Sequence, residues 1–438
     1  MKKILLGVAI ACSSTLVHAD IRTHTAPGVV PAGTYVDPSG SMREPGDVNN
    51  DVVRANDVYF IPDATGTATP SSLCETPASL ACVYGLTPQV PGCPISGTSA
   101  VPNAGAGTTI AVVEGGDNSS QASDLQTYST KYQLATPVLN IYVGANADCS
   151  TDPSAAGQSE QTEHVLDLEM IHALAQYATI DEVEAQTTNS STVCNGNPPC
   201  STSAQLGAAL DCAAKLVNAA GGGFISDSYG GKERSNETQD DVHFNHPGAI
   251  VVMSSGDYSA PANYPASSPY VVGTGAISIL RDANGNFKGE SAWNVNLEKQ
   301  QLGEKSGTSG GPSVYESRPP YQRFVQKIVG TQRGTPDVAA DGDPATGPCV
   351  YSTFDGGWIQ SGGTSAAAPQ MAAIFDTAPY KVNNNTTAFD FLNYLYYTAQ
   401  KNYHTYWHDG INGNNGYPAM QGYDFVTGLG SPRGYGGK

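Results

Sequence analysis

The sequence has few charged residues, and few of those are basic. Charged residues make up 14% of the 438 positions, and 21 Lys and Arg stand against 40 Asp and Glu, giving a formal net charge of −19. This balance argues against nucleic acid or an anionic membrane as a partner, because both carry negative charge themselves. It suits an acidic medium, where carboxylates lose their charge instead of repelling one another.

Long apolar runs are missing except near the start of the chain. The basic pair Lys2-Lys3 precedes an apolar stretch at 4–11, and Val-His-Ala at 17–19 has the small residues of a cleavage site, a pattern typical of a secretory signal peptide. The stretch is too short to span a membrane, and no later segment is long enough. We therefore expect residues 1–19 to be a signal peptide and the protein to be secreted or periplasmic.

No spacing of cysteine and histidine resembles a zinc site. Nine cysteines become eight once Cys12 leaves with the signal peptide, and an even number in an exported chain indicates disulfide bonds. The sequence leaves the pairing open, although Cys194 and Cys200 are near enough for a local loop closure. The eight are Cys74, Cys82, Cys93, Cys149, Cys194, Cys200, Cys212 and Cys349.

Strand-like and helix-like segments alternate from about residue 105 onward. Short apolar runs bounded by glycine are typical of strands buried on both faces, and helical periodicity separates them. This alternation predicts an α/β fold with a mostly parallel central sheet and helices on both faces. The expected strands are 108–114, 137–143, 178–183, 223–228 and 249–255, and the expected helices are 120–133, 162–176 and 204–220.

Residues 20–85 differ from the rest of the chain in composition. They are rich in Pro, Gly, Thr, Ser and Asp and have little periodicity. We expect an irregular N-terminal region here, either a short pro-segment or an extension that wraps the core. The main domain is then 86–438.

The turn Gly362-Gly363-Thr364-Ser365 runs directly into an alanine-rich segment. The glycines permit a sharp turn, and Ser365 falls in the first turn of the helix that follows, where unpaired N–H groups favour developing negative charge. A hydroxyl at this place is suited to attack a carbonyl. The plainer interpretation is an N-cap on an ordinary buried helix.

The expected helix at 162–176 carries two carboxylates one turn apart, Glu163 and Asp167. Residues four apart project from one face of a helix. In a low-dielectric cleft such a pair shares a proton, which gives a general base that works in acid, where imidazole is protonated. The alternative is a solvated acidic stripe, but apolar neighbours disfavour it. His164 points about 100° away round the helix, so it is not the obvious base.

Asp257 follows the last residues of an expected buried strand, in the stretch Ser254-Ser255-Gly256-Asp257. A carboxyl kept protonated by burial can donate a hydrogen bond to an oxyanion. In isolation, an ordinary Gly-Asp turn explains the same residues.

Residues 307–311, Gly-Thr-Ser-Gly-Gly, match the Gly-x-Ser-x-Gly pattern of hydrolase nucleophiles. That elbow requires an apolar strand before it, and the preceding residues 300–306 are polar. We therefore expect a flexible loop near the substrate cleft, without a nucleophile.

The C-terminal part contains oxygen ligands suited to calcium. Asp409 and Asp424 lie in Gly-rich stretches, and carboxylates with backbone carbonyls are the hard ligands that Ca²⁺ prefers. A Gly- and Asn-rich surface loop is the competing interpretation.

Taken together, these motifs resemble the sedolisin family of serine-carboxyl peptidases, in the subtilisin-like clan. The order Glu163, Asp167, Asp257, Ser365 is similar to that family's order, and neither the His-Gly-Thr-His nor the Asp-Thr-Gly setting of subtilisins is present. Further matching runs are 226–230, 264–271, 290–294, 320–322, 333–340 and 422–432, so the resemblance covers about 85–435.

The resemblance implies a role for each site residue and a subtilisin-like fold. Ser365 would be the nucleophile, Glu163 the base, Asp167 its orienting partner and Asp257 the oxyanion donor, with Glu114 behind the pair. One structural calcium ion would be bound by the Asp409 and Asp424 side chains and by carbonyls of Gly410, Met420 and Gly422.

The expected function is that of a secreted, acid-active endopeptidase that acts on polypeptides as a monomer. A calcium-stabilised binding protein on the same scaffold, with little or no catalysis, is the alternative. Two departures from the family pattern stand out. Only about 65 residues separate the expected signal peptide from the matching region, where the family usually has a large activation domain, and Tyr229 stands where tryptophan is common.

Overall fold

The structure is a computed structural model of the chain. It describes residues 34–36, 52–55, 58–61, 74–88, 90–95, 101–145, 148–152, 156–157, 161–194, 199–294 and 307–438. The predicted signal peptide at 1–19 lies outside the described residues. Among the residues described, no helix has both the length and the apolar character needed to cross a bilayer.

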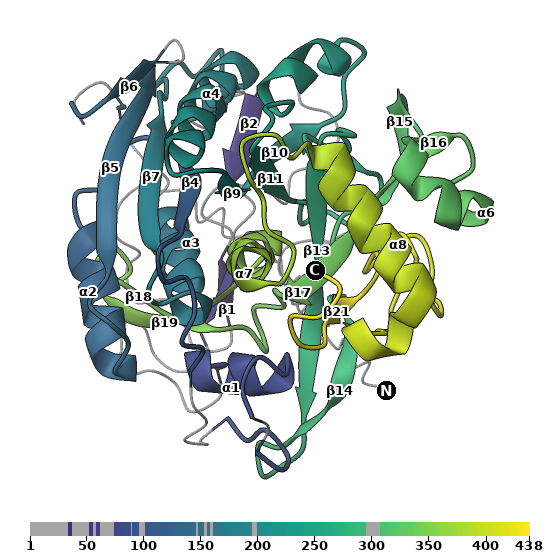
Figure 1. Cartoon of the computed structure of the whole chain (residues 1–438). Helices are drawn as coiled ribbons and strands as arrows, with labels where there is room; N and C mark the ends of the chain where they lie inside the picture. Colours follow the sequence, from purple (N-terminus) through teal and green to yellow (C-terminus); the bar gives the residue numbers. More distant parts are fainter. Residues whose placement is uncertain are drawn as a thin grey trace, which may run out of the picture.

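A nine-stranded, mostly parallel sheet forms the centre of the molecule (Figure 1). Its order is β14-β13-β11-β9-β4-β7-β5-β6, and β17 pairs with β13 as well. Within this sheet, the pairs β13–β14 and β5–β6 are antiparallel and the others are parallel. The strands are β4 (Thr109–Gly115), β5 (Val138–Ala145), β6 (Asp148–Ser150), β7 (Thr179–Ala185), β9 (Gly223–Asp227), β11 (Ala249–Ser254), β13 (Val271–Arg281), β14 (Phe287–Ala292) and β17 (Val338–Asp341).

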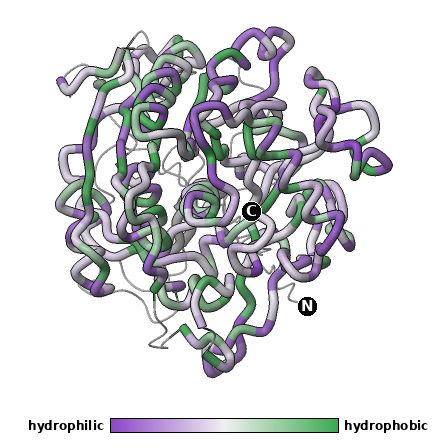
Figure 2. The backbone as a smooth tube through the Cα atoms, viewed as in Figure 1, coloured by the Kyte–Doolittle hydropathy of each residue, from purple (hydrophilic) through white to green (hydrophobic). Residues whose placement is uncertain are grey.

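Alternate residues of the central strands pack into two different hydrophobic clusters, one on each face of the sheet. On β4, Ile110 and Val112 belong to the larger buried cluster, whereas Ala111 and Val113 belong to the smaller one. This follows from the two-residue period of a strand. Figure 2 shows the hydrophobic segments concentrated in these central elements and the hydrophilic ones toward the periphery.

Helices cover both faces of the sheet, as the sequence predicted. On the face of the larger cluster lie α2 (Gln121–Tyr132), α3 (Gln161–Leu174), α7 (Thr364–Thr377) and α8 (Ala388–Tyr406). On the other face lies α4 (Ser203–Ala219), which packs against β4, β5 and β7. Threonine side chains accept from the third helical N–H in capping boxes at the starts of α4 and α8. The predicted helices and strands are thus confirmed to within a few residues.

Two helices of the larger face bring the candidate residues together. The helices α3 and α7 pack against each other, and both are buried almost all round. A helix that is covered on every side has no solvated face, whatever its side chains. Carboxylates on α3 are therefore enclosed, and the interpretation of a solvated acidic stripe is wrong for this helix.

The N-terminal region is more regular than its composition suggested. Described residues of 20–85 form β1 (Thr34–Val36), β2 (Val52–Ala55), β3 (Val58–Ile61) and α1 (Pro77–Val83). Helix α1 begins at a Thr76 cap with proline in its first turn. The strands β2 and β3 pair with strands of the main domain, so long-range pairing supplies an order that local periodicity could not reveal.

Shorter elements complete the described part of the chain. They are β8 (Ser201–Thr202), β10 (Tyr229–Lys232), β12 (Asn263–Tyr264), β15 (Gly311–Ser317), β16 (Gln332–Thr335), β18 (Cys349–Ser352), β19 (Gly357–Gly362), β20 (Trp407–His408), β21 (Ser431–Pro432), α6 (Gln326–Val329) and the 3₁₀ helices η2 (Glu237–His243) and η3 (Pro320–Val325).

Four disulfide bonds pair all eight cysteines of the expected set. They are Cys74–Cys349, Cys82–Cys93, Cys149–Cys212 and Cys194–Cys200. The last of these is the local closure that the sequence indicated.

Candidate active site

Acidic side chains line the end of the sheet where the parallel strands finish. Glu114 lies next to the last residue of β4, and its even position places it on the same face as Ile110 and Val112, toward α3. Asp227 ends β9, the neighbouring strand. Both side chains are fully buried. Ligands of open α/β sheets bind at this end of the strands.

Ser365 is the second residue of α7, directly after a glycine turn. Gly363 has φ of 84°, a left-handed conformation that favours glycine. At Gly362, a Cβ would lie only 2.5 Å from the backbone nitrogen of Pro344, so the turn has no room for a side chain. Ser365 Oγ donates a hydrogen bond to the carbonyl of Ser228 (3.4 Å). The turn thus fixes the hydroxyl next to the end of β9.

Asp167 connects to this serine through Ser228. The Ser228 hydroxyl donates to Asp167 Oδ2 at 2.7 Å and lies 3.5 Å from the carbonyl oxygen of Ser365. Burial raises the pKa of Asp167 well above its usual range. The Ser228 hydrogen bond lowers that pKa, and the charge of Asp227 raises it further. In the sequence Ser228 stood out only as part of a matching run, and the structure gives it this bridging position.

Glu163 lies in the first turn of α3, one helical turn before Asp167, and is fully buried. Its negative charge affects the pKa of Glu114. Burial is the main cause that raises the pKa of Glu114, and the charges of Asp167 and Glu163 raise it further. Three carboxyl groups therefore form one low-dielectric network beside Ser365.

Asp257 is tied to the residue before the serine. Its Oδ1 accepts from both the backbone N–H and the hydroxyl of Thr364, each at 2.8 Å. The same hydroxyl accepts from the N–H of Gly256 at 2.9 Å. Thr364 was not singled out in the sequence, although its place beside Ser365 was a usable signal. These bonds hold the Asp257 carboxyl at the N-terminus of α7.

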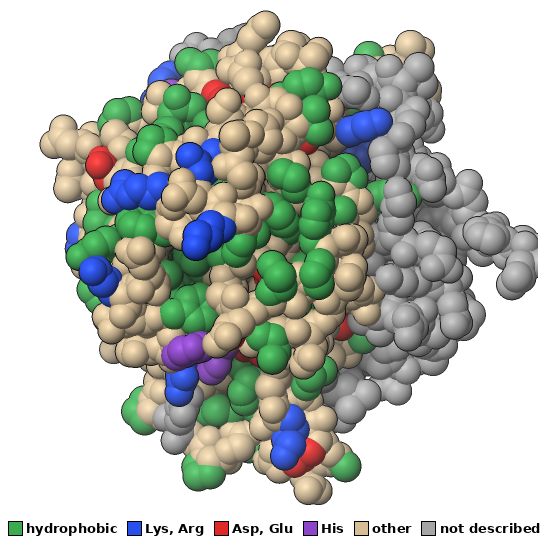
Figure 3. Space-filling view, turned by 90° about the vertical axis from the view of Figure 1, so that its right-hand side faces the viewer, with side chains coloured by type: hydrophobic (Ala, Val, Ile, Leu, Met, Phe, Trp, Pro, Cys, Tyr) green, Lys and Arg blue, Asp and Glu red, His purple; other side chains and the backbone are tan. Residues whose placement is uncertain are grey.

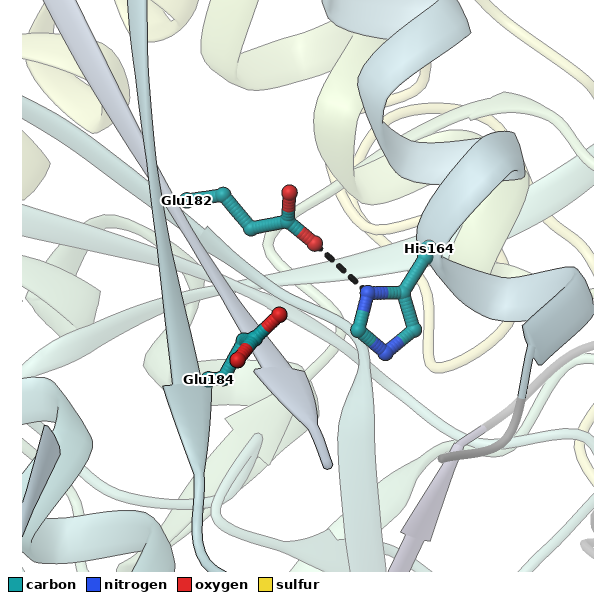
Figure 4. A group of neighbouring side chains, drawn as sticks. All are labelled: His164, Glu182 and Glu184. Atoms are coloured by element: carbon teal, nitrogen blue, oxygen red, sulfur yellow. Dashed lines mark hydrogen bonds and ion pairs between the residues drawn. The ribbon is translucent and has the colours of Figure 1, made fainter. Parts of the chain in front are cut away.

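His164 forms a second buried group with Glu182 and Glu184 (Figure 4). His164 Nδ1 lies 2.5 Å from Glu182 Oε1, and Glu184 follows two residues later on β7. Ligand atoms of the three side chains lie within 4.8 Å of one another, an arrangement that could bind a cation. Sequence reasoning missed Glu182 and Glu184, even though two glutamates at alternate positions in a buried strand are unusual enough to be a signal.

The stretch 307–311 is packed against the Asp257 turn. Thr308 and Ser309 are fully buried. The Ser309 backbone N–H donates to the carbonyl of Gly256 at 2.7 Å, and its hydroxyl accepts from the N–H of Tyr258 at 3.0 Å. The expectation of a flexible loop is wrong for 307–311, because these bonds fix it. Residues 300–306 lie outside the described residues.

The strand β2 lies between β10 and β8 as the central strand of an antiparallel set. Ala55 is opposite Tyr229, Arg54 is opposite Gly230, and Val53 is opposite Ser201. In Figure 1 this strand, coloured purple, runs beside β10. Tyr229 directly follows Ser228, which contacts Ser365. An extended segment from the N-terminal region therefore ends next to the candidate nucleophile.

The chain continues from β2 to the other side of the serine. In β3, Val58 is opposite Gly362, three residues before Ser365. Only two residues of sequence join Ala55 to Val58. The two strands thus flank the Gly362–Ser365 turn along the chain.

The predicted calcium ligands come from one C-terminal loop region. The Tyr403 hydroxyl bonds both Asp409 Oδ1 (3.1 Å) and the carbonyl oxygen of Gly422 (3.3 Å), which brings these two oxygens together. Asp424 is buried, and its Oδ2 accepts from the N–H of Met420 at 2.7 Å. Gly410 is buried next to Asp409. All five residues offer oxygen ligands, which suits Ca²⁺.

Many of the acidic side chains are inside the protein rather than on its surface. Figure 3 shows the face that carries α8, α6 and β15, where red acidic groups are sparse and hydrophobic and polar atoms are mixed. Because the chain has only 21 basic residues against 40 acidic ones, ion pairs cannot serve every carboxyl. A buried carboxyl without a cation beside it depends on hydrogen bonds or on protonation.

Comparison with curated proteins identifies relatives over most of the chain. It is 29% identical over 354 residues to sedolisin of Pseudomonas sp. (strain 101), covering 77% of this chain and 57% of that protein. It is 29% identical over 362 residues to kumamolisin of Bacillus sp. (strain MN-32), covering 75% and 59%. A shorter match of 178 residues, 33% identical, links it to xanthomonalisin of Xanthomonas sp. (strain T-22), covering 38% and 21%. The chain thus spans under two thirds of the length of these relatives.

Comparison with solved structures supports the same relationship at the level of the fold. Pseudomonas sedolisin, a serine-carboxyl proteinase solved with two molecules of pseudo-iodotyrostatin, has a TM-score of 0.63 and 23% identity, and the match covers 83% of this chain and 96% of that chain. No protein-family model matches the chain. The predicted subtilisin-like fold is therefore confirmed.

Proposed function

We propose that this relative of the sedolisins is a secreted, acid-active serine-carboxyl endopeptidase. The observation that carries the proposal is the linkage of Asp167, Ser228 and Ser365 by hydrogen bonds at the carboxyl end of the sheet. All four residues selected from the sequence are buried on elements that meet there.

The proposed reaction begins with proton transfer from the Ser365 hydroxyl to the Glu163 carboxylate. The serine oxygen attacks the peptide carbonyl, and the oxyanion accepts a hydrogen bond from protonated Asp257, which Thr364 orients. Glu163 then gives its proton to the leaving amine, which produces an acyl-enzyme. Water, deprotonated by Glu163, releases the second product and restores the serine.

In this mechanism Asp167 is a positioning residue that shares its proton with Glu163. Its pKa is raised by burial, so the pair holds a proton under conditions where ordinary carboxyls are ionised. A carboxylate base keeps its function in acid, where a histidine base would be protonated. The acidic composition of the chain agrees with such working conditions.

We propose further that residues 20–85 include a short pro-segment whose strand β2 occupies the substrate groove. In a four-stranded antiparallel sheet β2 lies between β10 and β8, and an extended peptide that pairs with strands in this way binds through main-chain hydrogen bonds. Because β2 ends beside the Ser365 turn, maturation would cut the chain between Ala55 and Val58. Export would be directed by residues 1–19.

Peptide cleavage across pH 3–8 tests the proposed activity. Casein hydrolysis should be maximal at acidic pH, and Ser365→Ala should reduce it on the order of 10⁴-fold or more, because the nucleophile is removed. N-terminal sequencing should find the wild type cut between Ala55 and Val58 and the variant uncut. A neutral optimum would contradict the carboxylate base, and an absence of Ser365-dependent cleavage would favour the binding-protein alternative.

We propose that the C-terminal loop binds one structural Ca²⁺ ion through Asp409, Asp424 and carbonyls of Gly410, Met420 and Gly422. When bound, the ion would cross-link this loop and supply no chemistry to the reaction. The convergence of Asp409 Oδ1 and Gly422 O on Tyr403 supports this donor set. The all-oxygen composition excludes a preference for softer metals.

Calcium removal should lower thermal stability. With free Ca²⁺ at about 100 times its Kd, binding contributes about 2.7 kcal/mol, so EGTA should lower Tm by several degrees. Asp424→Asn should make Tm independent of calcium, whereas Asp282→Asn, in an exposed turn between β13 and β14, should retain the dependence. Equal Tm values of the wild type in Ca²⁺ and in EGTA would refute the site.

A further inference from the structure

The side chains of β2 alternate between two environments. Val53 and Ala55 are buried in the smaller core cluster, together with Val113 and Tyr229. Val52 contacts a separate apolar group formed by Cys194 and Cys200. Because successive residues of a strand point to opposite faces, Arg54 shares the face of Val52, toward the disulfide loop.

Two carbonyls beside the Cys194–Cys200 disulfide accept hydrogen bonds from the Arg54 guanidinium. Arg54 Nη2 donates to the carbonyl of Cys194 at 2.7 Å, and Nη1 donates to the carbonyl of Pro199 at 3.4 Å. The arginine is only 7% exposed. The disulfide joins Cys194 to Cys200, the residue after Pro199, so it keeps both acceptors near one planar guanidinium.

Both of these acceptors are neutral carbonyls. A carboxylate acceptor would be protonated and would lose its charge in acid, but a carbonyl does not titrate. Arginine stays charged at every pH relevant here. The two carbonyls therefore recognise arginine equally well under the acidic conditions in which the proposed peptidase works.

We infer that the carbonyls of Cys194 and Pro199, beside the Cys194–Cys200 disulfide, form a specificity subsite for an arginine side chain in polypeptide substrates. Arg54 occupies it in the uncut chain, and a substrate strand that replaces β2 between β10 and β8 would place its residue opposite Gly230 there. The inference rests on the proposed peptidase function, because it assumes that β2 marks the path of a substrate.

Two synthetic peptides test the subsite with the processed enzyme. One has the sequence of residues 51–61, Asp-Val-Val-Arg-Ala-Asn-Asp-Val-Tyr-Phe-Ile, and the other carries Arg54→Gln. The arginine peptide should have a kcat/KM about ten-fold or more higher, because glutamine cannot supply the charged hydrogen bonds. An Arg54→Lys peptide should fall between them, since an ammonium does not have the planar fork that meets both carbonyls.

A loop variant with a matched control separates the subsite from general effects of losing a disulfide. In Cys194→Ser/Cys200→Ser the ratio of kcat/KM for the arginine and glutamine peptides should fall toward one. In Cys82→Ser/Cys93→Ser, which removes another short-range disulfide outside the groove, the ratio should stay at the wild-type value.

Three results would overturn the subsite. Equal kcat/KM of the wild type for the arginine and glutamine peptides refutes it while the peptidase stands. Cleavage of casein but of neither peptide also refutes it, because β2 would then not resemble a substrate. If casein and both peptides remain intact at every pH from about 3 to 8, the proposed peptidase function fails and the subsite fails with it.

Discussion

Glu163→Gln should lower kcat for peptide hydrolysis by about 10²–10⁴-fold, the range expected for loss of a general base. Glutamine has nearly the same shape, but its amide cannot accept the proton of Ser365. Glu163 is fully buried in the first turn of α3, so the substitution also removes an acidic group from a low-dielectric site and should not destabilise the fold. The measurement is kcat and KM at pH 4 with the peptide of residues 51–61.

Glu169→Gln is the matched control for this substitution. Glu169 is a second fully buried glutamate on the same helix, and its Oε2 accepts from the backbone N–H of Tyr351 at 2.9 Å, away from Ser365. Its pKa is likewise raised, with burial as the main cause. We expect nearly wild-type kcat for this variant. If Glu163→Gln kept more than a tenth of the wild-type kcat, another group would have to be the base.

The fold could be predicted from the sequence where periodicity and strand length were strong. Buried strands such as β4 and β11 are short apolar runs between glycines, and helices such as α4 repeat apolar residues at helical spacing. The strands β2 and β3 could not be predicted in this way. Each has only four residues, and its order comes from pairing with β10 or β19, far along the chain.

For the candidate site, too, local features could be predicted and long-range contacts could not. Spacing placed Glu163 and Asp167 on one helix face, local motifs selected Ser365 and Asp257, and the resemblance joined the four into one set with assigned roles. Contacts between segments far apart in the chain could not be predicted from the sequence. These include the hydrogen bond from Ser228 to Asp167 and the hydrogen bonds from Thr364 to Asp257. The run 333–340 illustrates the same limit. In the structure Arg333 forms a fully buried ion pair with Asp337 at 2.6 Å, and Asp337 also accepts from the N–H of Gly273 on β13.

The stability of the folded protein should fall as pH rises from 4 to 8. Burial is the main cause that raises the pKa of Asp227 to about 8 and that of Glu184 to about 9, and the pKa values of Glu114 and Asp167 are raised well above their usual range. A carboxyl whose pKa is raised in the folded protein does not lower the stability below its unfolded pKa of about 4, because it is protonated in both the folded and the unfolded state there. Above that pH the unfolded state ionises first, so stability declines until the folded pKa is passed.

A few groups act in the opposite direction, but the buried carboxyls outnumber them. Burial lowers the pKa of His172 and lowers that of His408 to about 4, so the cost of burying these histidines is relieved as pH rises toward their unfolded pKa of about 6.5. Asp211 is a third such group. Burial tends to raise the pKa of Asp211, but hydrogen bonds and charges of His243 and His246 outweigh it and leave the pKa below its usual range. Its stabilisation is present above the unfolded pKa and is lost only as pH falls below about 4. Asp211 is a single, partly exposed group, whereas the buried carboxyls near the active site are several and fully enclosed.

The size of the decline in stability decides whether the protein stays folded at neutral pH. A pKa that differs by one between the folded and unfolded states corresponds to about 1.4 kcal/mol of stability, and typical domains have a margin of about 5–15 kcal/mol. Asp227 and Glu184 would stay protonated in the folded protein while they ionise in the unfolded chain, and this difference would remove part of that margin between pH 4 and 8. Tm measured by scanning fluorimetry should fall steadily over this range.

Glu184→Gln, which keeps an acceptor for Gln121, should make the fall shallower by removing one titrating group. A Tm that is constant or rises toward pH 8 would contradict the expected decline, and it would mean that the buried carboxyls ionise with little cost. A fall would instead tie the acidic working range to the buried carboxyls themselves, because the burial that gives Asp167 its proton at the active site is also what destabilises the fold at neutral pH.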